Sequence, residues 1–168
     1  MNDEALYLLL AEENHHDRLS FQQALKEIKV NTVLDFVCDG AELLDLLGQQ
    51  QDHLPHVVFL DLDLPSKGAL EYLTDIRRES RHADLVVAIV AADGSDQIMQ
   101  EAFVRGANIF LHRTNEFDGL TCMLSQAISI FWQYYTSGFR RDNFILNISQ
   151  HHCKGGQNKT RLYHSNGW

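Results

Sequence analysis

Three acidic residues follow apolar runs of the sequence, where a parallel sheet presents side chains that do chemistry. Glu12 and Glu13 follow residues 5–11 (ALYLLLA), and Asp61 closes residues 56–61 (HVVFLD). If the two runs are neighbouring strands, the three carboxylates converge in one crevice. Such a cluster repels itself unless a cation neutralises it. Hard oxygen ligands suit Mg²⁺, which also keeps waters and binds phosphate oxygens.

Asp61 is the member of this group with a further chemical use. An aspartate beside Mg²⁺ can attack phosphorus and form an acyl phosphate, while the metal neutralises the incoming phosphoryl group. Any one of these acids alone would be interpreted as a helix cap or a solvated loop residue. The prediction of a carboxylate site depends on acids at two strand ends that the fold makes adjacent.

The elements that position these residues alternate between strand and helix. Apolar runs predict strands at 5–11, 32–37, 56–61, 85–92 and 108–112, and helical periodicity predicts helices at about 15–28, 40–48, 68–79, 96–105 and 116–135. Asn14 and Ser95 are predicted N-caps, Gly48 a helix end and Gly106 a C-terminal glycine. The pattern predicts an α/β fold with a doubly wound, five-stranded parallel sheet of flavodoxin-like order 2-1-3-4-5 and helices on both faces.

Length and charge limit the classes of function. The 168 residues suit one domain, and the net charge of −9 argues against a nucleic-acid-binding surface. The chain opens with acidic residues, and its first apolar run is too short to span a bilayer, so we expect no membrane association and a cytoplasmic location. Residues 1–137 carry 22 of the 23 acids, whereas residues 138–168 carry one acid and five bases. We expect a C-terminal extension over 138–168 that is largely flexible, docked at most through 144–148.

The last predicted helix carries more apolar surface than one core-facing stripe needs. The stripe at helical spacing comprises Leu120, Leu124, Ala127, Ile128, Phe131 and Tyr135. Met123, Ile130, Trp132 and Tyr134 lie outside it or at its edge. They predict a second buried surface, which is either a homodimer contact or a seat for residues 139–148. We favour the dimer.

The chain resembles the receiver domain of two-component response regulators over about residues 5–136. The resemblance rests on Glu12-Glu13, on FLDLDLP at 59–65 and on Gly106-Ala107-Asn108. Within that chemotaxis-regulator-like family it is similar to the stand-alone regulators paired with phytochromes, on EENHHDR at 12–18 and DGAELLD at 39–45.

The resemblance implies a role for each matching residue. Asp61 matches the phosphoacceptor, and Glu12 and Glu13 match the acidic pair that binds Mg²⁺. Asp63 stands where the family offers a backbone carbonyl to the metal, and Phe110 matches the aromatic switch residue. The implied partner is a sensor histidine kinase, and the implied output is protein contact.

Several positions depart from the family pattern. Ala91 replaces the Ser or Thr that binds the phosphoryl oxygen, and Arg113 replaces the strand-five Lys. Arginine keeps the charge but is longer and forked. Thr114 replaces a cis-proline, and it makes a cis peptide there improbable. The missing hydroxyl removes a hydrogen bond worth about 1.5–3 kcal/mol.

Three functions therefore stay open. Asp61 is phosphorylated by a histidine kinase, which we favour because the carboxylates and the cation are retained. Alternatively, the chain is a pseudo-receiver that acts by binding alone. A third reading is an enzyme, because residues 57–63 (VVFLDLD) resemble the nucleophile motif of haloacid-dehalogenase-type phosphatases. That motif normally lies on a first strand, so we do not predict an enzyme.

Overall fold

The five apolar runs are strands of one sheet in the computed structural model, which describes residues 5–50, 52–137, 146–148 and 161–162. The sheet order is β2-β1-β3-β4-β5-β6-β7, so the predicted order of the first five strands is confirmed. The strands are β1 (Leu6–Ala11), β2 (Thr32–Val37), β3 (Val57–Asp61), β4 (Val86–Ala91), β5 (Ile109–His112), β6 (Leu146–Ile148) and β7 (Arg161–Leu162). Within the first five strands, every neighbouring pair is parallel, because a helical crossover connects consecutive strands.

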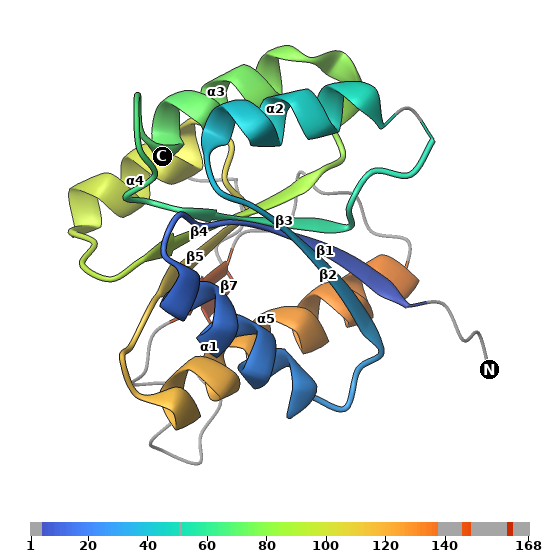
Figure 1. Ribbon diagram of the computed structural model, residues 1–168, viewed down its shortest axis with the longest axis vertical. Coiled ribbons are helices and arrows are strands. Elements are labelled where there is room, and N and C mark those ends of the chain that lie inside the picture. Colours follow the sequence, from blue (N-terminus) through green and yellow to red (C-terminus); the bar gives the residue numbers. More distant parts are fainter. Residues whose placement is uncertain (1–4, 51, 138–145, 149–160, 163–168) are drawn as a thin grey trace.

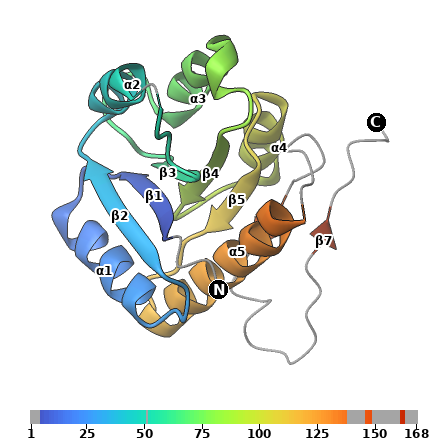
Figure 2. The ribbon, with the colours of Figure 1, turned by 90° about the vertical axis from the view of Figure 1, so that its right-hand side faces the viewer.

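The helices cover both faces of the sheet, as predicted (Figures 1 and 2). Helices α1 and α5 lie on one face, and α2, α3 and α4 lie on the other. Each layer encloses its own hydrophobic core against the strands. The helices are α1 (His15–Lys26), α2 (Gly40–Gln49), α3 (Ala69–Arg78), α4 (Asp96–Val104) and α5 (Phe117–Thr136), with a short 3-10 turn at Ser80–His82.

Local signals set the helix ends in most cases. The Asn14 side chain accepts from the backbone N–H groups of His16 and Asp17, and Ser95 caps α4 in the same manner, so both predicted caps are confirmed. Gly106 follows α4 with φ of 101°, a conformation that favours glycine. Gly48 does not end α2, which continues to Gln49.

The C-terminal extension contributes to the sheet. Strand β6 pairs in parallel with β5, so β5 is an interior strand rather than the edge of a five-stranded sheet. Ile148 is buried in the core beneath α5, and Asn147 bonds His112 at 2.9 Å. The predicted docking of 144–148 therefore has a counterpart at 146–148. Most of the extension predicted to be flexible lies outside the described residues.

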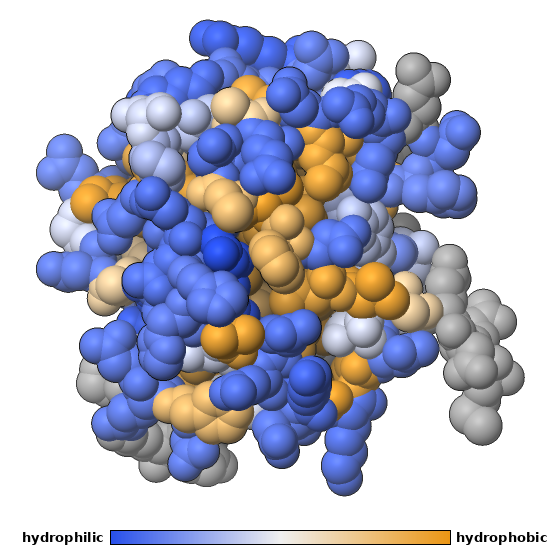
Figure 3. All heavy atoms as spheres, in the orientation of Figure 1, coloured by the Kyte–Doolittle hydropathy of each residue, from blue (hydrophilic) through white to orange (hydrophobic). Residues whose placement is uncertain are grey.

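The extra aromatics of α5 are explained in part by packing within the chain. Ile130, Trp132 and Tyr134 pack against the core that contains Ile148. On the opposite edge of the sheet, β2 exposes Val33 and Phe36, and Figure 3 shows orange hydrophobic atoms across this face between the two helical layers. Among the described residues, no helix is long and apolar enough to cross a membrane.

We predict that β6 is part of the cooperative fold. Ile148→Ala empties a buried site and should lower the free energy of unfolding by about 2–4 kcal/mol. Val104→Ala, at a position that is 87% exposed, is the matched control and should change it by less than about 0.5 kcal/mol. Urea denaturation measures both, and equal effects of the two variants would contradict the inclusion of β6.

Candidate functional site

The pairing of β1 with β3 brings Glu12 and Asp61 to the same edge of the sheet. Ala11 is opposite Leu60, so Glu12 and Asp61 occupy the next position in register. The predicted adjacency of these two strands is confirmed. Both acids are only 5% exposed, although acids are almost never buried without a partner. The β1–β3 edge therefore holds two carboxylates away from water.

Asp61 is the less satisfied of the two carboxylates. Its Oδ1 atom is buried without a hydrogen-bond partner. Burial raises the pKa of Asp61 from 3.8 to about 6, and the charges of Glu12 and Asp63 add to the shift. The charge of Arg113 and the backbone N–H of Asp63 oppose it without cancelling it. A buried carboxylate with a free oxygen and a perturbed pKa is typical of a functional position.

Glu12, by contrast, has a partner for each oxygen. Its Oε1 accepts from the Asn14 backbone N–H at 2.8 Å, and its Oε2 accepts from Arg113 at 3.2 Å. Burial nevertheless raises the pKa of Glu12, because desolvation outweighs these two favourable contacts. The N-cap turn at Asn14 thus also fixes the orientation of this carboxylate.

Glu13 differs from the other two acids in its exposure to solvent. Its side chain is exposed, and Arg18 bonds the backbone carbonyls of Glu12 and Glu13 at 2.8 and 2.9 Å. Of the residues that the structure describes, no three acid, histidine or cysteine side chains form a group that could hold a metal ion. The expected convergence of three carboxylates therefore stays a prediction, since Glu12 and Asp61 are buried whereas Glu13 is exposed.

Two carboxylates remain with the chemistry that a divalent cation requires. Asp61 offers an oxygen without a partner, and Glu12 offers a second buried oxygen donor. Mg²⁺ binds one or two carboxylates and fills its remaining positions with water and phosphate oxygens. The donor set therefore fits Mg²⁺, although Glu12 is engaged by Arg113. The Asp63 side chain is exposed, and its charge raises the pKa of Asp61.

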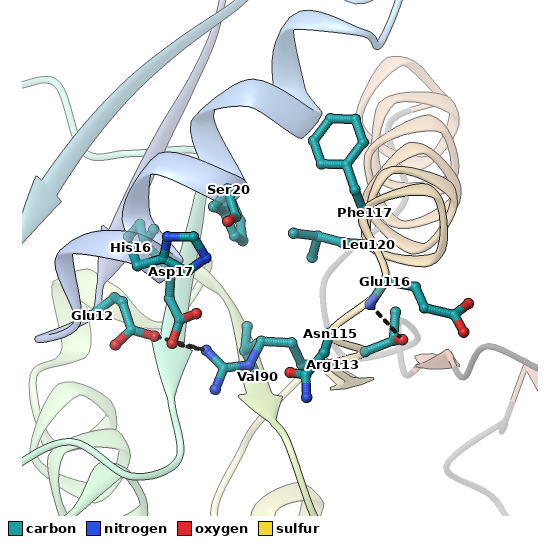
Figure 4. A pocket seen from close by; sticks show the side chains of 13 residues that line it. Glu12, His16, Asp17, Ser20, Val90, Arg113, Asn115, Glu116, Phe117 and Leu120 are labelled. Carbon is teal, nitrogen blue, oxygen red and sulfur yellow. Dashed lines mark hydrogen bonds and ion pairs between the residues drawn. The ribbon is translucent and has the colours of Figure 1, made fainter.

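Arg113 bonds the acids of the β1–α1 side of the site. Its backbone N–H donates to the Ala91 carbonyl at 2.7 Å, which places the side chain over the sheet edge. Its Nη1 donates to Glu12 Oε2 at 3.2 Å and to Asp17 Oδ2 at 2.9 Å (Figure 4). These three residues line a cavity of about 250 Å³ between α1 and the start of α5.

Asp17 and Arg18 are the residues near the site that sequence reasoning missed. Asp17 lies in the first turn of α1, three residues after the Asn14 cap, which places it near the end of β1. That position was readable from the cap. Its ion pair with Arg113 joins residues 96 apart in the chain and needs the tertiary structure.

Ala91 and Phe110 lie side by side in the opposite core. Phe110 is fully buried and makes edge-to-face contacts with Phe103 and His112. A Cβ atom added to Gly94 would lie 2.8 Å from the Phe110 ring, so the ring occupies space that this glycine leaves open. Ala91 is buried beside them and offers only a methyl group. No cis peptide bond occurs in the described part of the chain, as Thr114 predicts.

Comparison with known proteins decides the family. The family model of the response regulator receiver domain matches this sequence over residues 8–125. The chain belongs to the response regulator receiver family. This receiver is 25% identical over 133 residues to the probable methanogenesis regulatory protein FilR2 of Methanothrix harundinacea, covering 77% of this chain and 85% of that protein. It is also 25% identical over 129 residues to response regulator Rcp1 of a Synechocystis strain, covering 74% and 87%.

Solved structures agree on the fold. The phosphorylated cyanobacterial phytochrome response regulator RcpA superposes with a TM-score of 0.69 at 22% identity, covering 79% of this receiver and 96% of that chain. The bacteriophytochrome response regulator AtBRR gives 0.63 at 26%, covering 77% and 96%. The receiver is thus structurally similar to phytochrome-associated regulators. Because this is a signalling family, the phosphatase alternative is contradicted and the non-enzymatic prediction is confirmed.

We predict that ionised Asp61 destabilises the fold. When a carboxyl group has a higher pKa in the folded state, the folded protein loses stability as the pH rises, here from near 3.8 through about 6. In metal-free buffer, Asp61→Asn should gain stability over wild type across this window, by about 3 kcal/mol at most above pH 7. Urea denaturation at about pH 4.5 and about pH 8 measures this difference in the free energy of unfolding.

Asp84→Asn is the matched control, because it removes an exposed carboxylate that is not among the charges acting on Asp61. A pH-independent difference between Asp61→Asn and wild type, or the same gain in Asp84→Asn, would contradict the assignment.

Proposed function

We propose that this receiver accepts a phosphoryl group on Asp61 from a sensor histidine kinase and signals by protein contact. The observation that carries the proposal is the buried Asp61 Oδ1, which lacks a partner at a strand end beside Glu12. With a pKa of about 6, Asp61 is mostly ionised and nucleophilic above neutral pH. A response regulator works with a histidine kinase, and the solved relative RcpA is a phosphorylated protein.

The transfer requires only a nucleophile, a leaving group and charge stabilisation. An Asp61 oxygen forms a bond to phosphorus while the bond from phosphorus to the donor histidine nitrogen breaks, and that nitrogen keeps the electron pair. Mg²⁺, held by Glu12 and Asp61 with Glu13 and the Asp63 carbonyl as further donors, would supply positive charge for the phosphoryl oxygens. The relative Rcp1 has been solved in a Mn²⁺-bound form. Arg113 is the nearby protein cation.

Two features favour weak coupling between phosphorylation and shape. Ala91 has no hydroxyl to bind the phosphoryl group, and Phe110 is already fully buried. If the inward position of the Phe110 ring is the signal that a partner recognises, the unphosphorylated protein already has the ring in that position. This supports the second candidate, a pseudo-receiver that binds its partner without phosphorylation. The two candidates differ in whether Asp61 reacts.

Phosphorylation is tested with acetyl phosphate and Mg²⁺. Intact-mass spectrometry should detect one added phosphoryl group on wild type and on Asp63→Asn, and none on Asp61→Asn. Asp63→Asn is the control because the family role of that residue uses its backbone. An unmodified wild type would reject the phosphoacceptor and leave the pseudo-receiver.

Restoring the hydroxyl should strengthen the reaction. Ala91→Ser adds a donor to the phosphoryl oxygen, a hydrogen bond to a charged group worth about 1.5–3 kcal/mol. We expect roughly tenfold or more faster phosphorylation by acetyl phosphate. Ala92→Ser, one residue beyond the end of β4, is the control and should leave the rate unchanged. Equal rates for Ala91→Ser and wild type would mean that position 91 does not face the phosphoryl group.

The remaining predictions concern the oligomeric state, nucleic-acid binding and the location of the protein in the cell. Exposed Phe117 and Tyr135 on α5 support a homodimer through this helix, which sedimentation velocity of wild type and Tyr135→Glu tests. The acidic body supports the absence of nucleic-acid binding. We also propose a cytoplasmic location, which fractionation of cells that express the protein tests.

A further inference from the structure

The geometry points to Arg113 as a built-in counter-cation that competes with a divalent metal ion for Glu12. Asp17 holds the guanidinium in this position. The inference rests on the proposed site, in which Glu12 and Asp61 are the carboxylates that bind the metal. It adds a control on that site, because the positive charge of Arg113 at Glu12 opposes the binding of a second cation there.

The contact between Arg113 and Glu12 uses the oxygen that a metal would need. Glu12 Oε1 already accepts from the Asn14 backbone N–H, and Oε2 accepts from Arg113 Nη1 at 3.2 Å. Both side chains are shielded from water, with 7% of Glu12 and 18% of Arg113 exposed. Each Glu12 oxygen thus already accepts one hydrogen bond, and the positively charged donor lies at Oε2, where it competes with a metal ion for that oxygen. The backbone donor belongs to the capping turn of α1, whereas the guanidinium ends a flexible side chain.

Asp17 gives Arg113 a second anchor on the far side of Glu12. Its Oδ2 accepts from the same Nη1 at 2.9 Å, so one nitrogen joins two carboxylates from the β1–α1 turn and the first helical turn (Figure 4). Asp61 Oδ1 receives no hydrogen bond from the part of the chain that the structure describes. The guanidinium thus neutralises one member of the acidic pair and leaves the other with a free oxygen. One guanidinium nitrogen can bridge the two acids because it carries two N–H groups.

Displacement requires no unfolding. When Arg113 leaves Glu12 Oε2 it can keep Asp17, which is 31% exposed and lines the same cavity. The metal ion and the Arg113 guanidinium are both cations at the same carboxylate, so metal affinity should fall as the Glu12–Arg113 contact strengthens. Arg113 is in this sense a positioning residue, which acts on the site through Glu12.

The test compares two arginines that lie close to Glu12. Arg113→Gln removes the side chain that bonds the Glu12 carboxylate. Arg18→Gln removes an equal charge whose Nη1 lies 2.8 Å from the Glu12 carbonyl but bonds no carboxylate in the described structure. Binding of Mn²⁺ to metal-free protein is measured by electron paramagnetic resonance of the free ion.

We expect Arg113→Gln to bind Mn²⁺ roughly fivefold tighter than wild type, the size of a partly shielded ion pair, and Arg18→Gln to change affinity by less than about twofold. Asp61→Asn should lose this binding, which locates the ion. Equal gains in the two arginine variants would reduce the effect to general charge and overturn the competition. No gain in Arg113→Gln, including no binding at all, would also overturn it.

A second measurement uses wild type, so that it does not depend on the folding of a variant. The Arg113 Nε–Hε resonance, assigned by its loss in Arg113→Gln, should shift when Mg²⁺ is added to wild type and stay unchanged in Asp61→Asn. An unchanged resonance at saturating Mg²⁺ would contradict displacement. Phosphorylation of Asp61 by acetyl phosphate in the same samples separates the two proposals, because that reaction can succeed while Arg113 proves to be a bystander.

Discussion

Two carboxylates held out of water at neighbouring strand ends are the constraint on which this site depends. The parallel register of β1 and β3 places Glu12 beside Asp61, and both are almost fully buried. Like charges in such a place repel each other and lose their hydration. The fold stabilises the two carboxylates unequally. Glu12 accepts hydrogen bonds from a backbone N–H and a guanidinium, whereas Asp61 has an unbonded oxygen and a raised pKa in the described structure.

That asymmetry gives the two acids different chemical roles. Asp61 is the carboxylate with a free oxygen, which is what a nucleophile or a metal ligand requires. Glu12 is already stabilised through Asn14 and Arg113, so it orients the pair. Arg113 is itself held by Asp17, and the site therefore extends from β1 and β3 into the first turn of α1 and the end of β5.

The opposite edge of the sheet shows how an extension alters a familiar architecture. Strand β6 covers β5, and Asn147 bonds His112, whose ring contacts Phe110. The C-terminal segment is thus linked by contacts to the core position that the family resemblance marks as the switch. Phe110 is enclosed by Gly94, Phe103 and His112, so its buried position is determined by packing.

The sequence by itself determined the order of the first five strands, the caps at Asn14 and Ser95 and the identity of the acids, because periodicity and capping are local and strand ends of a parallel sheet converge by rule. Only the tertiary structure decided that Glu13 is exposed, that Arg113 bonds Glu12 and Asp17, and that β6 joins the sheet. Those outcomes depend on side-chain directions and on contacts between residues far apart in the chain. Local patterns carry no information on the distance between such groups.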